Sequence, residues 1–350
     1  MSAAFEALAL RAIERGWLPD PLVRVGIRRL PGDTLARERK GGEAAIRARR
    51  VALLREMRGS PIALHTADAN RQHYELPAEY FRLVLGPHLK YSCGLWSLGA
   101  RTLAESEEAM LALTAARAGI ADGQRILDLG CGWGSLLLWL AERFPNARIT
   151  AVSNSAGQRA FIEARTAERG LTNLCAVTAD MNVFTPERSF DRIVSVEMFE
   201  HMRNWPRLLE RVAWWLAPGG ALFVHVFCHR DLAYRFETGT RSDWMARHFF
   251  TGGLMPSANL LASVSGPLRV VRQWHVSGAE YAATCRAWLE RHDAQRAAIL
   301  PLFREVYGEG AGRWFVRWRL FYLACAGLFE HTGGTEWFVT HTLLESRRTP

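Results

Sequence analysis

Between residues 125 and 227, short apolar segments alternate with segments whose apolar residues recur at helical spacing. The apolar segments are typical of buried strands, and the others are typical of amphipathic helices. Their alternation predicts a parallel sheet that is covered by helices on both faces. The expected strands are 125–130, 147–153, 174–180, 191–197 and 221–227, and the expected helices are 135–144, 156–170 and 205–220.

The rest of the chain follows a looser pattern. Helical spacing predicts helices at 3–16, 43–58 and 102–118, with a turn at LPGDT (30–34), while residues 60–100 indicate short helices and loops. After residue 230, a loop-rich stretch precedes a strand at 268–276, two or three helices, and a last strand at 335–346. We therefore expect a helical N-terminal region, 1–101, that acts as a lid, and a main domain, 102–350, with a pocket-forming insertion at about 231–335.

Composition narrows the class of protein. With 350 residues, 49% hydrophobic and 23% charged, the chain is an ordinary globular one. No apolar run reaches the length of a membrane span, and the first residues lack a signal-peptide pattern, so we expect a cytoplasmic protein. The six scattered cysteines form no CxxC pair, which argues against a zinc site or a disulfide framework.

The net charge of +9 is concentrated near the N-terminus, where residues 21–60 hold eleven Arg or Lys. The simple interpretation is a solvated helix face, and the alternative is a surface for peripheral contact with an anionic membrane. No aromatic residue lies among these basic residues, so we expect no nucleic-acid partner.

A glycine-rich loop lies between the first expected strand and the following helix. In ILDLGCGWGS (126–135), glycines at 130, 132 and 134 let the backbone pass close beneath a ligand where a Cβ would collide. Ser135 stands where a dinucleotide-binding GxGxxG loop needs its third glycine, which argues against a dehydrogenase. The order strand, Asp128, GxGxG, helix is typical of class I S-adenosylmethionine (SAM) methyltransferases. We therefore predict this α/β, Rossmann-like fold with SAM as cofactor.

Two later segments add to the expected SAM site. At the end of the third strand, Asp180 could hold the adenine amino group while Met181 packs on the ring. Class I enzymes generally place an acid at the end of the second strand to bind both ribose hydroxyls. Here that place reads VSNSAGQ, so the amides of Asn154 and Gln158 would bind the ribose instead.

Together these motifs resemble the cyclopropane fatty acid synthase superfamily, and within it the plant coclaurine N-methyltransferase-like enzymes. The resemblance covers nearly the whole chain. It rests on ANRQHYELPAEYF (69–81), LKYSCGLW (89–96), DRIVSVEMFEHM (191–202), LFVHVFCH (222–229), FFTGGLMPSANLL (249–261) and GAEYAATCRAWLER (278–291). Beside Asp128, the positions that the resemblance assigns to SAM binding are Tyr91, Ser92, Gly130, Gly132, Asn154, Gln158, Asp180 and Met181.

The resemblance also assigns catalytic positions. In the N-methyltransferases the acid–acid–histidine cluster is catalytic, which here means Glu197, Glu200 and His201. In cyclopropane synthases a bicarbonate base is held by positions that match Cys93, Glu200, His225 and Tyr281, and all four residue types are present. Those synthases usually have glycine where this chain has Glu197, which favours amine methylation.

The acid–histidine cluster suits the chemistry of an amine. A protonated amine has no free electron pair, so it must lose a proton to a nearby base before it can attack a methyl group. We expect Glu200 or His201 to be that base and Glu197 to attract the ammonium form. The segment lacks the first histidine of a metal-binding HxxEH, so we expect no metal.

The predicted function is SAM-dependent N-methylation of a small aromatic, tetrahydroisoquinoline-like amine. The first alternative is a cyclopropane synthase that acts on unsaturated phospholipid acyl chains. The second is a SAM-binding protein without catalysis, which the intact glycine loop and acid cluster disfavour. The sequence leaves the oligomeric state open, with a homodimer as one alternative.

Overall fold

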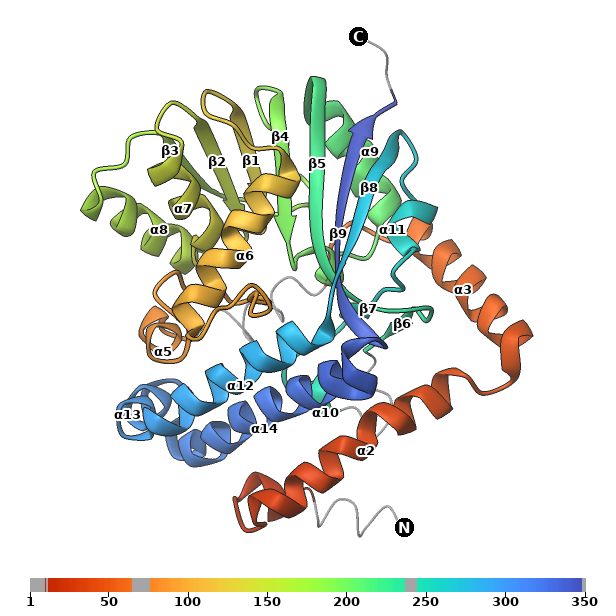
Figure 1. Cartoon of the computed structure of the whole chain (residues 1–350), viewed down its shortest axis with the longest axis vertical. Helices are drawn as coiled ribbons and strands as arrows, with labels where there is room; N and C mark the ends of the chain where they lie inside the picture. The colour runs from red at the N-terminus through yellow and green to blue at the C-terminus, as the bar shows by residue number, and fades with distance from the viewer. Residues whose placement is uncertain (1–9, 11, 65–75, 237–243, 348–350) are drawn as a thin grey trace.

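The computed structural model describes residues 10, 12–64, 76–236 and 244–347. At its centre is a seven-stranded sheet in the order β3–β2–β1–β4–β5–β9–β8 (Figure 1). The strands are β1 (Arg125–Leu129), β2 (Arg148–Ser153), β3 (Leu174–Thr178), β4 (Phe190–Val196), β5 (Leu216–His229), β8 (Leu268–Val276) and β9 (Trp337–Ser346). The strands from β3 to β5 are parallel, and β9 runs antiparallel between β5 and β8.

Helices cover the sheet and form a second layer at the carboxyl ends of its parallel strands (Figure 1). The helices of the sheet domain are α6 (Leu103–Ala118), α7 (Ser135–Arg143), α8 (Ala156–Glu168), α9 (Trp205–Trp215) and α11 (Leu260–Ser263). The remaining helices are α2 (Asp20–Glu38), α3 (Gly42–Gly59), α5 (Ala78–Val84), α10 (Trp244–His248), α12 (Gly278–Ala294), α13 (Arg296–Tyr307) and α14 (Ala311–Glu330). Two short strands, β6 (Tyr234–Arg235) and β7 (Leu254–Met255), form a separate pair.

The expected strands and helices of the sheet are all present, with one correction to the end of a helix and one correction in the N-terminal region. The turn expected at 30–34 is wrong, because α2 runs through it with Pro31 buried inside the helix. Helix α2 is held by α14: Arg319 binds both oxygens of Asp20 at 2.7 Å, and a Cβ on Gly327 would lie only 2.6 Å from Ile27 Cγ2. This packing outweighs the hydrogen bond that proline cannot donate. The expected helix at 3–16 lies mostly outside the described residues.

The second correction concerns the end of α9. We expected this helix to continue to residue 220, but it ends at Trp215 and β5 begins at Leu216. Pro218 and Gly219 follow within the next residues, and Gly219 has a φ of +73°. A proline and a left-handed glycine both oppose helix continuation, so the chain changes to extended backbone earlier than expected.

Aromatic side chains join the segment before residue 102 to the C-terminal helices. The buried Tyr80 of α5 bonds the Tyr322 hydroxyl of α14 at 2.8 Å and lies 3.3 Å from His292 Nδ1 of α12. Its neighbour Phe81 packs against Trp133, inside the glycine loop, with ring centroids 5.0 Å apart and ring planes tilted by 39°. The N-terminal segment, α12 and α14 thus share one core that reaches the loop after β1.

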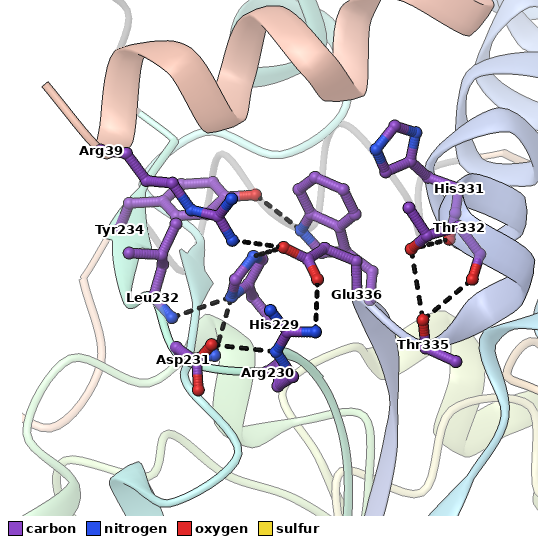
Figure 2. Close-up of polar contacts among 11 residues, drawn as sticks. Arg39, His229, Arg230, Asp231, Leu232, Tyr234, His331, Thr332, Thr335 and Glu336 are labelled. Carbon is purple, nitrogen blue, oxygen red and sulfur yellow. Dashed lines mark hydrogen bonds and ion pairs between the residues drawn. The ribbon is translucent and has the colours of Figure 1, made fainter.

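A polar cluster fastens α2 to the sheet at the junction of β5 and β9. Figure 2 shows the buried Glu336 carboxylate between two arginines: Arg39, just after α2, lies 2.5 Å away and Arg230 lies 3.0 Å away. Nearby, the His229 Nδ1 atom accepts backbone N–H groups from Asp231 and Leu232. The cluster fixes the end of β5 and the start of β9, two strands that carry residues of the site.

The start of α12 has no room for a side chain at Gly278. A Cβ there would lie 2.1 Å from Trp337 O and 2.4 Å from Phe329 O. We expect Gly278→Ala to lower the free energy of unfolding by about 2 kcal/mol or more, because backbone atoms cannot move aside cheaply. The control Gly26→Ala, in open space inside α2, should raise it by about 0.5–1 kcal/mol. Urea unfolding of both variants tests this, and equal effects would contradict the packing described.

Candidate active site

The glycine loop connects β1 to α7 and exposes its backbone. Gly130, Gly132 and Gly134 have φ values of +83°, +52° and +86°, which glycine adopts without strain. A Cβ on Gly130 would lie 2.6 Å from the Met198 side chain, whereas one on Gly132 would meet nothing within 4 Å. The loop therefore needs glycine for its conformation, and at Gly132 also for the space in front of the backbone.

Two cavities, of about 680 Å³ and 630 Å³ including the open solvent at their mouths, adjoin at this loop. Gly130, Gly132 and Glu197 line both of them. The larger is also lined by Ala63, Leu64, Val152, Ser153, Asn154, Gln158, Ala179, Met181, Met198, His201 and Met202. The smaller is also lined by Leu89, Lys90, Tyr91, Ser92, Leu111, Thr114, Asp128, Cys131, Trp133, Ser135, Leu136 and Val196.

The structure brings together all but one of the predicted SAM-binding residues. Tyr91, Ser92 and Asp128 line the smaller cavity. Asn154, Gln158 and Met181, predicted to bind the ribose and adenine, line the larger one. Asp180 lies outside both linings, and its Oδ1 accepts the backbone N–H of Asn182 at 2.7 Å.

The polar groups of these cavities fit SAM. Gln158 Nε2, Trp133 Nε1 and Ser135 Oγ are buried and have no hydrogen-bond partner among the described residues. Buried polar atoms are normally bonded, so these donors suit a polar ligand. Burial raises the pKa of Asp128 to about 7, and a neighbouring cation such as the ammonium of SAM would stabilise its charged form. When bound, SAM supplies a methyl group on a sulfonium.

Glu197 leaves β4 in a backbone conformation that the sequence did not indicate. After β4 the chain forms a single 3₁₀ turn, Phe199–His201, rather than a longer helix. Glu197 itself is left-handed, with φ +50°, and its N–H donates to His225 O at 2.8 Å. The bond to the neighbouring strand holds this costly conformation and directs the side chain between the two cavities.

Three hydrogen-bond donors surround the Glu197 carboxylate, which is 9% exposed. The backbone N–H of Cys93 and the Nε2 atom of His225 each lie 3.1 Å from Oε1, and the Tyr281 hydroxyl donates to Oε2 at 2.5 Å. Burial raises the pKa of Glu197 to about 6, and the charge of Lys90 and the bonds from Tyr281 and Cys93 oppose the rise. Glu197 is therefore mostly ionised at neutral pH.

Glu200 and His201 occupy different surroundings. Glu200 is fully buried, accepts the Phe227 N–H at 2.8 Å, and lines neither cavity. Burial and the charge of Glu197 raise the pKa of Glu200 well above its ordinary value, so Glu200 is neutral where Glu197 is ionised. His201 lines the larger cavity, and its ring lies edge-on to Phe250, with centroids 4.8 Å apart.

Aromatic side chains continue from His201 toward Tyr281. Phe250 lies 5.8 Å from Phe227 between ring centroids, and Phe227 lies 6.1 Å from Phe329. Phe329 in turn stacks on Tyr281 at 4.4 Å. Phe199, Phe249 and Trp337 are fully buried core residues. The half-buried Phe227 and Phe250 offer ring faces that attract a cation or an aromatic ligand.

Three polar residues of this region were not predicted from the sequence. Lys90 is buried, lines the smaller cavity and donates to the Ser92 hydroxyl, although it stands inside the quoted LKYSCGLW segment. His341 lies in β9 and is hydrogen-bonded to His225, and Arg117 of α6 is bonded to His341. A lone histidine in an apolar strand and one arginine among many give no local signal.

The fold and the glycine loop define a class I SAM-dependent methyltransferase. A family model described as mycolic acid cyclopropane synthetase matches residues 63–335. The chain belongs to this family, as the sequence motifs predicted. The class, the fold and SAM as cofactor are likewise confirmed.

Individual relatives agree with this assignment. The (S)-coclaurine N-methyltransferase of Thalictrum flavum subsp. glaucum is 35% identical over 97% of this chain and 95% of its own length. The cyclopropane-fatty-acyl-phospholipid synthase of Escherichia coli strain K12 is 32% identical over 74% of this chain and 64% of its own length. A crystal structure of coclaurine N-methyltransferase bound to N-methylheliamine and SAH has a TM-score of 0.93 at 34% identity and covers 98% of this chain and 100% of its own.

The more distant structures share the fold alone. The cyclopropane synthase MmaA2 from Mycobacterium tuberculosis has a TM-score of 0.67 at 23% identity, over 81% of this chain and 98% of its own. Its lower score and coverage place it apart from the N-methyltransferase structure.

Gly132 and Gly123 have similar backbone conformations, so their substitutions distinguish an effect on SAM binding from an effect on stability. Gly132 and Gly123 both have positive φ and open space at Cβ, but only Gly132 lines the cavities. We expect Gly132→Ala to weaken SAM binding by about tenfold or more, because the methyl group projects where the ligand must pass. Gly123→Ala should cost a similar ~1 kcal/mol of stability and leave SAM affinity unchanged. Calorimetric titration with SAM measures both, and unchanged affinity in Gly132→Ala would remove the loop from the SAM site.

Proposed function

We propose that this protein transfers a methyl group from SAM to the nitrogen of a small aromatic amine, such as a tetrahydroisoquinoline. The observation that carries the proposal is the Glu197 carboxylate, which three hydrogen-bond donors hold in the wall shared by the two cavities. A carboxylate in this place attracts an ammonium group to the edge of the predicted SAM site. The aromatic residues beside His201 support an aromatic acceptor.

The proposed chemistry divides the work between two side chains. Glu197 binds the ammonium group and orients it, and His201 takes the proton that frees the electron pair. The nitrogen then forms a bond to the methyl carbon as the carbon–sulfur bond breaks, and the sulfonium becomes a neutral thioether. Alignment of the two partners in the site lowers the barrier. Glu200 acts through Glu197 as a positioning residue, because its neutral carboxyl leaves the negative charge on Glu197.

The alternative lipid function is less well supported by the surroundings of Glu197. The family resemblance implies that cyclopropane synthases hold a bicarbonate at positions that match Cys93, Glu200, His225 and Tyr281. In this chain Cys93, His225 and Tyr281 all bond the Glu197 carboxylate instead. A side-chain carboxylate thus occupies the donors that a bound bicarbonate would need.

We also propose where in the cell the protein acts. Across the described ranges, no helix is long and apolar enough to cross a membrane. We expect the protein to act in the cytoplasm on a dissolved amine. The arginines of α2 and α3 leave peripheral contact with anionic lipid as the alternative that goes with a lipid acceptor, and the oligomeric state, including a homodimer, is left to measurement.

Methyl transfer from labelled SAM to two acceptor pools tests the proposed function. One pool contains tetrahydroisoquinoline amines, and the other contains vesicles of unsaturated phospholipid with an anionic fraction. We expect label in the amines alone, because the ionised carboxylate selects a cationic acceptor. Label in the lipid alone would establish the cyclopropane synthase function, and SAM binding without any transfer would indicate a silent SAM-binding protein.

Removal of the Glu197 side chain tests its role directly. We expect Glu197→Gly to lower kcat/KM by about a hundredfold or more, because the amine loses its anionic partner. Added bicarbonate or formate should restore part of the activity, since the glycine variant leaves the three donors free and the space open. The isosteric Glu197→Gln is the matched control, because its amide fills the same space and excludes the anion. Rescue of both variants, or of neither, would contradict the role assigned to the carboxylate.

A further inference from the structure

A series of hydrogen-bonded side chains connects Glu197 through the sheet to α6. Arg117 Nη1 lies 2.9 Å from His341 Nδ1, and His341 Nε2 lies 2.9 Å from His225 Nδ1. His225 Nε2 then lies 3.1 Å from Glu197 Oε1. The two histidines are direct partners in the register of β5 and β9, and both are fully buried.

Arg117 at one end and Glu197 at the other determine which atom donates in every hydrogen bond of this series. A guanidinium can only donate, so His341 Nδ1 must accept, and the ring proton of neutral His341 is on Nε2. That proton is donated to His225 Nδ1, so His225 in turn carries its proton on Nε2. The last donor therefore points at the Glu197 carboxylate, which accepts.

We propose that Arg117 and His341 are positioning residues of the active site, which hold His225 as the neutral Nε2–H tautomer so that its N–H donates to Glu197. Without them, His225 would be free to adopt the Nδ1–H tautomer. A nitrogen lone pair would then face the carboxylate oxygen, and repulsion between the two would disfavour the ionised form of Glu197. The inference deepens the proposed function, because it concerns the group that binds the ammonium.

The surroundings of the two rings also keep them neutral. Burial and the charges of Lys90 and Arg117 lower the pKa of both His225 and His341 well below the ordinary value. Around Glu197 and the rings, the titratable and charged groups from all packed elements are Lys90, Cys93, Arg117, Glu200, His225, Tyr281 and His341.

The direction of these hydrogen bonds determines which route the proton from the amine can take. Each ring N–H points toward Glu197, and the guanidinium at the far end cannot accept a proton. A proton taken from the amine therefore cannot leave through His225 and His341. The proton leaves instead through His201, which lines the larger cavity.

A substitution of Arg117 has a matched control at Arg272, which lies beside the same aromatic ring. Arg117 and Arg272 each lie with their guanidinium carbon 5.0 Å from the centroid of the Trp274 ring, but only Arg117 is bonded to His341. Arg117→Met removes the donor and one positive charge, and Arg272→Met removes an equal charge beside the same ring without touching the histidines. Arg117→Lys keeps a group that can only donate.

The first readout is the pH dependence of kcat/KM for amine methylation. Activity should fall as pH drops through the value at which Glu197 becomes protonated, which is about 6 in the native protein. In Arg117→Met this acid limb should move up by about one pH unit, with about a twofold loss at pH 7 that approaches about tenfold below pH 6, because the carboxylate loses a reliable donor. Arg117→Lys and Arg272→Met should keep the native limb. Equal profiles for Arg117→Met and Arg272→Met would overturn the proposal.

The second readout needs no substrate, and it separates this proposal from the proposed function. Long-range ¹H–¹⁵N spectra of protein with ¹⁵N-labelled histidine report the tautomer of each ring. We expect His225 and His341 both as neutral Nε2–H in the native protein and in Arg272→Met, and a tautomer mixture in Arg117→Met. A native Nδ1–H or doubly protonated His225 would overturn the proposal even if amines are methylated. The expected tautomers together with no amine methylation would instead refute the proposed function alone.

Discussion

The site depends on keeping one buried carboxylate ionised. A carboxylate removed from water is costly unless donors replace its hydration shell, and Glu197 receives donors from three parts of the chain that are distant in sequence. Cys93 precedes α6, His225 lies in β5 and Tyr281 lies in α12. The N-terminal segment, the sheet and the C-terminal helices must therefore all be in place for the charge to exist. The shared aromatic core around Tyr80 and the cluster at Glu336 hold these parts together.

Much of the fold could be predicted because its signals are local. Each parallel strand is a short apolar run beside an amphipathic helix, and the glycine loop requires its glycines whatever surrounds it. The turn expected at 30–34 failed for the opposite reason. Proline and glycine oppose a helix locally, but α14 supplies packing against Ile27 and an ion pair to Asp20 that no local pattern reveals.

The candidate site likewise contains residues that local sequence patterns predict and residues that they do not. Most of its predicted residues came from motifs, and the structure gathers them around two adjoining cavities. The left-handed backbone of Glu197 and the partners His341 and Arg117 could not be foreseen, because they follow from the pairing of β5 with β9. That pairing brings residues 225 and 341 side by side across 116 positions of sequence. No spacing rule within one segment carries this information.

The number of hydrogen bonds at Glu197 bears on the kind of amine that the proposed function would favour. An ionised carboxylate accepts about four hydrogen bonds, and three donors already occupy it, two on Oε1 and one on Oε2. One acceptor position, on Oε2, remains for the substrate. A secondary ammonium has two N–H groups, so it can place one on Glu197 and present the other to His201, which lines the same cavity. A tertiary ammonium has only one N–H and must choose between anchor and base, so the arrangement suits a secondary amine as acceptor and a tertiary amine as product.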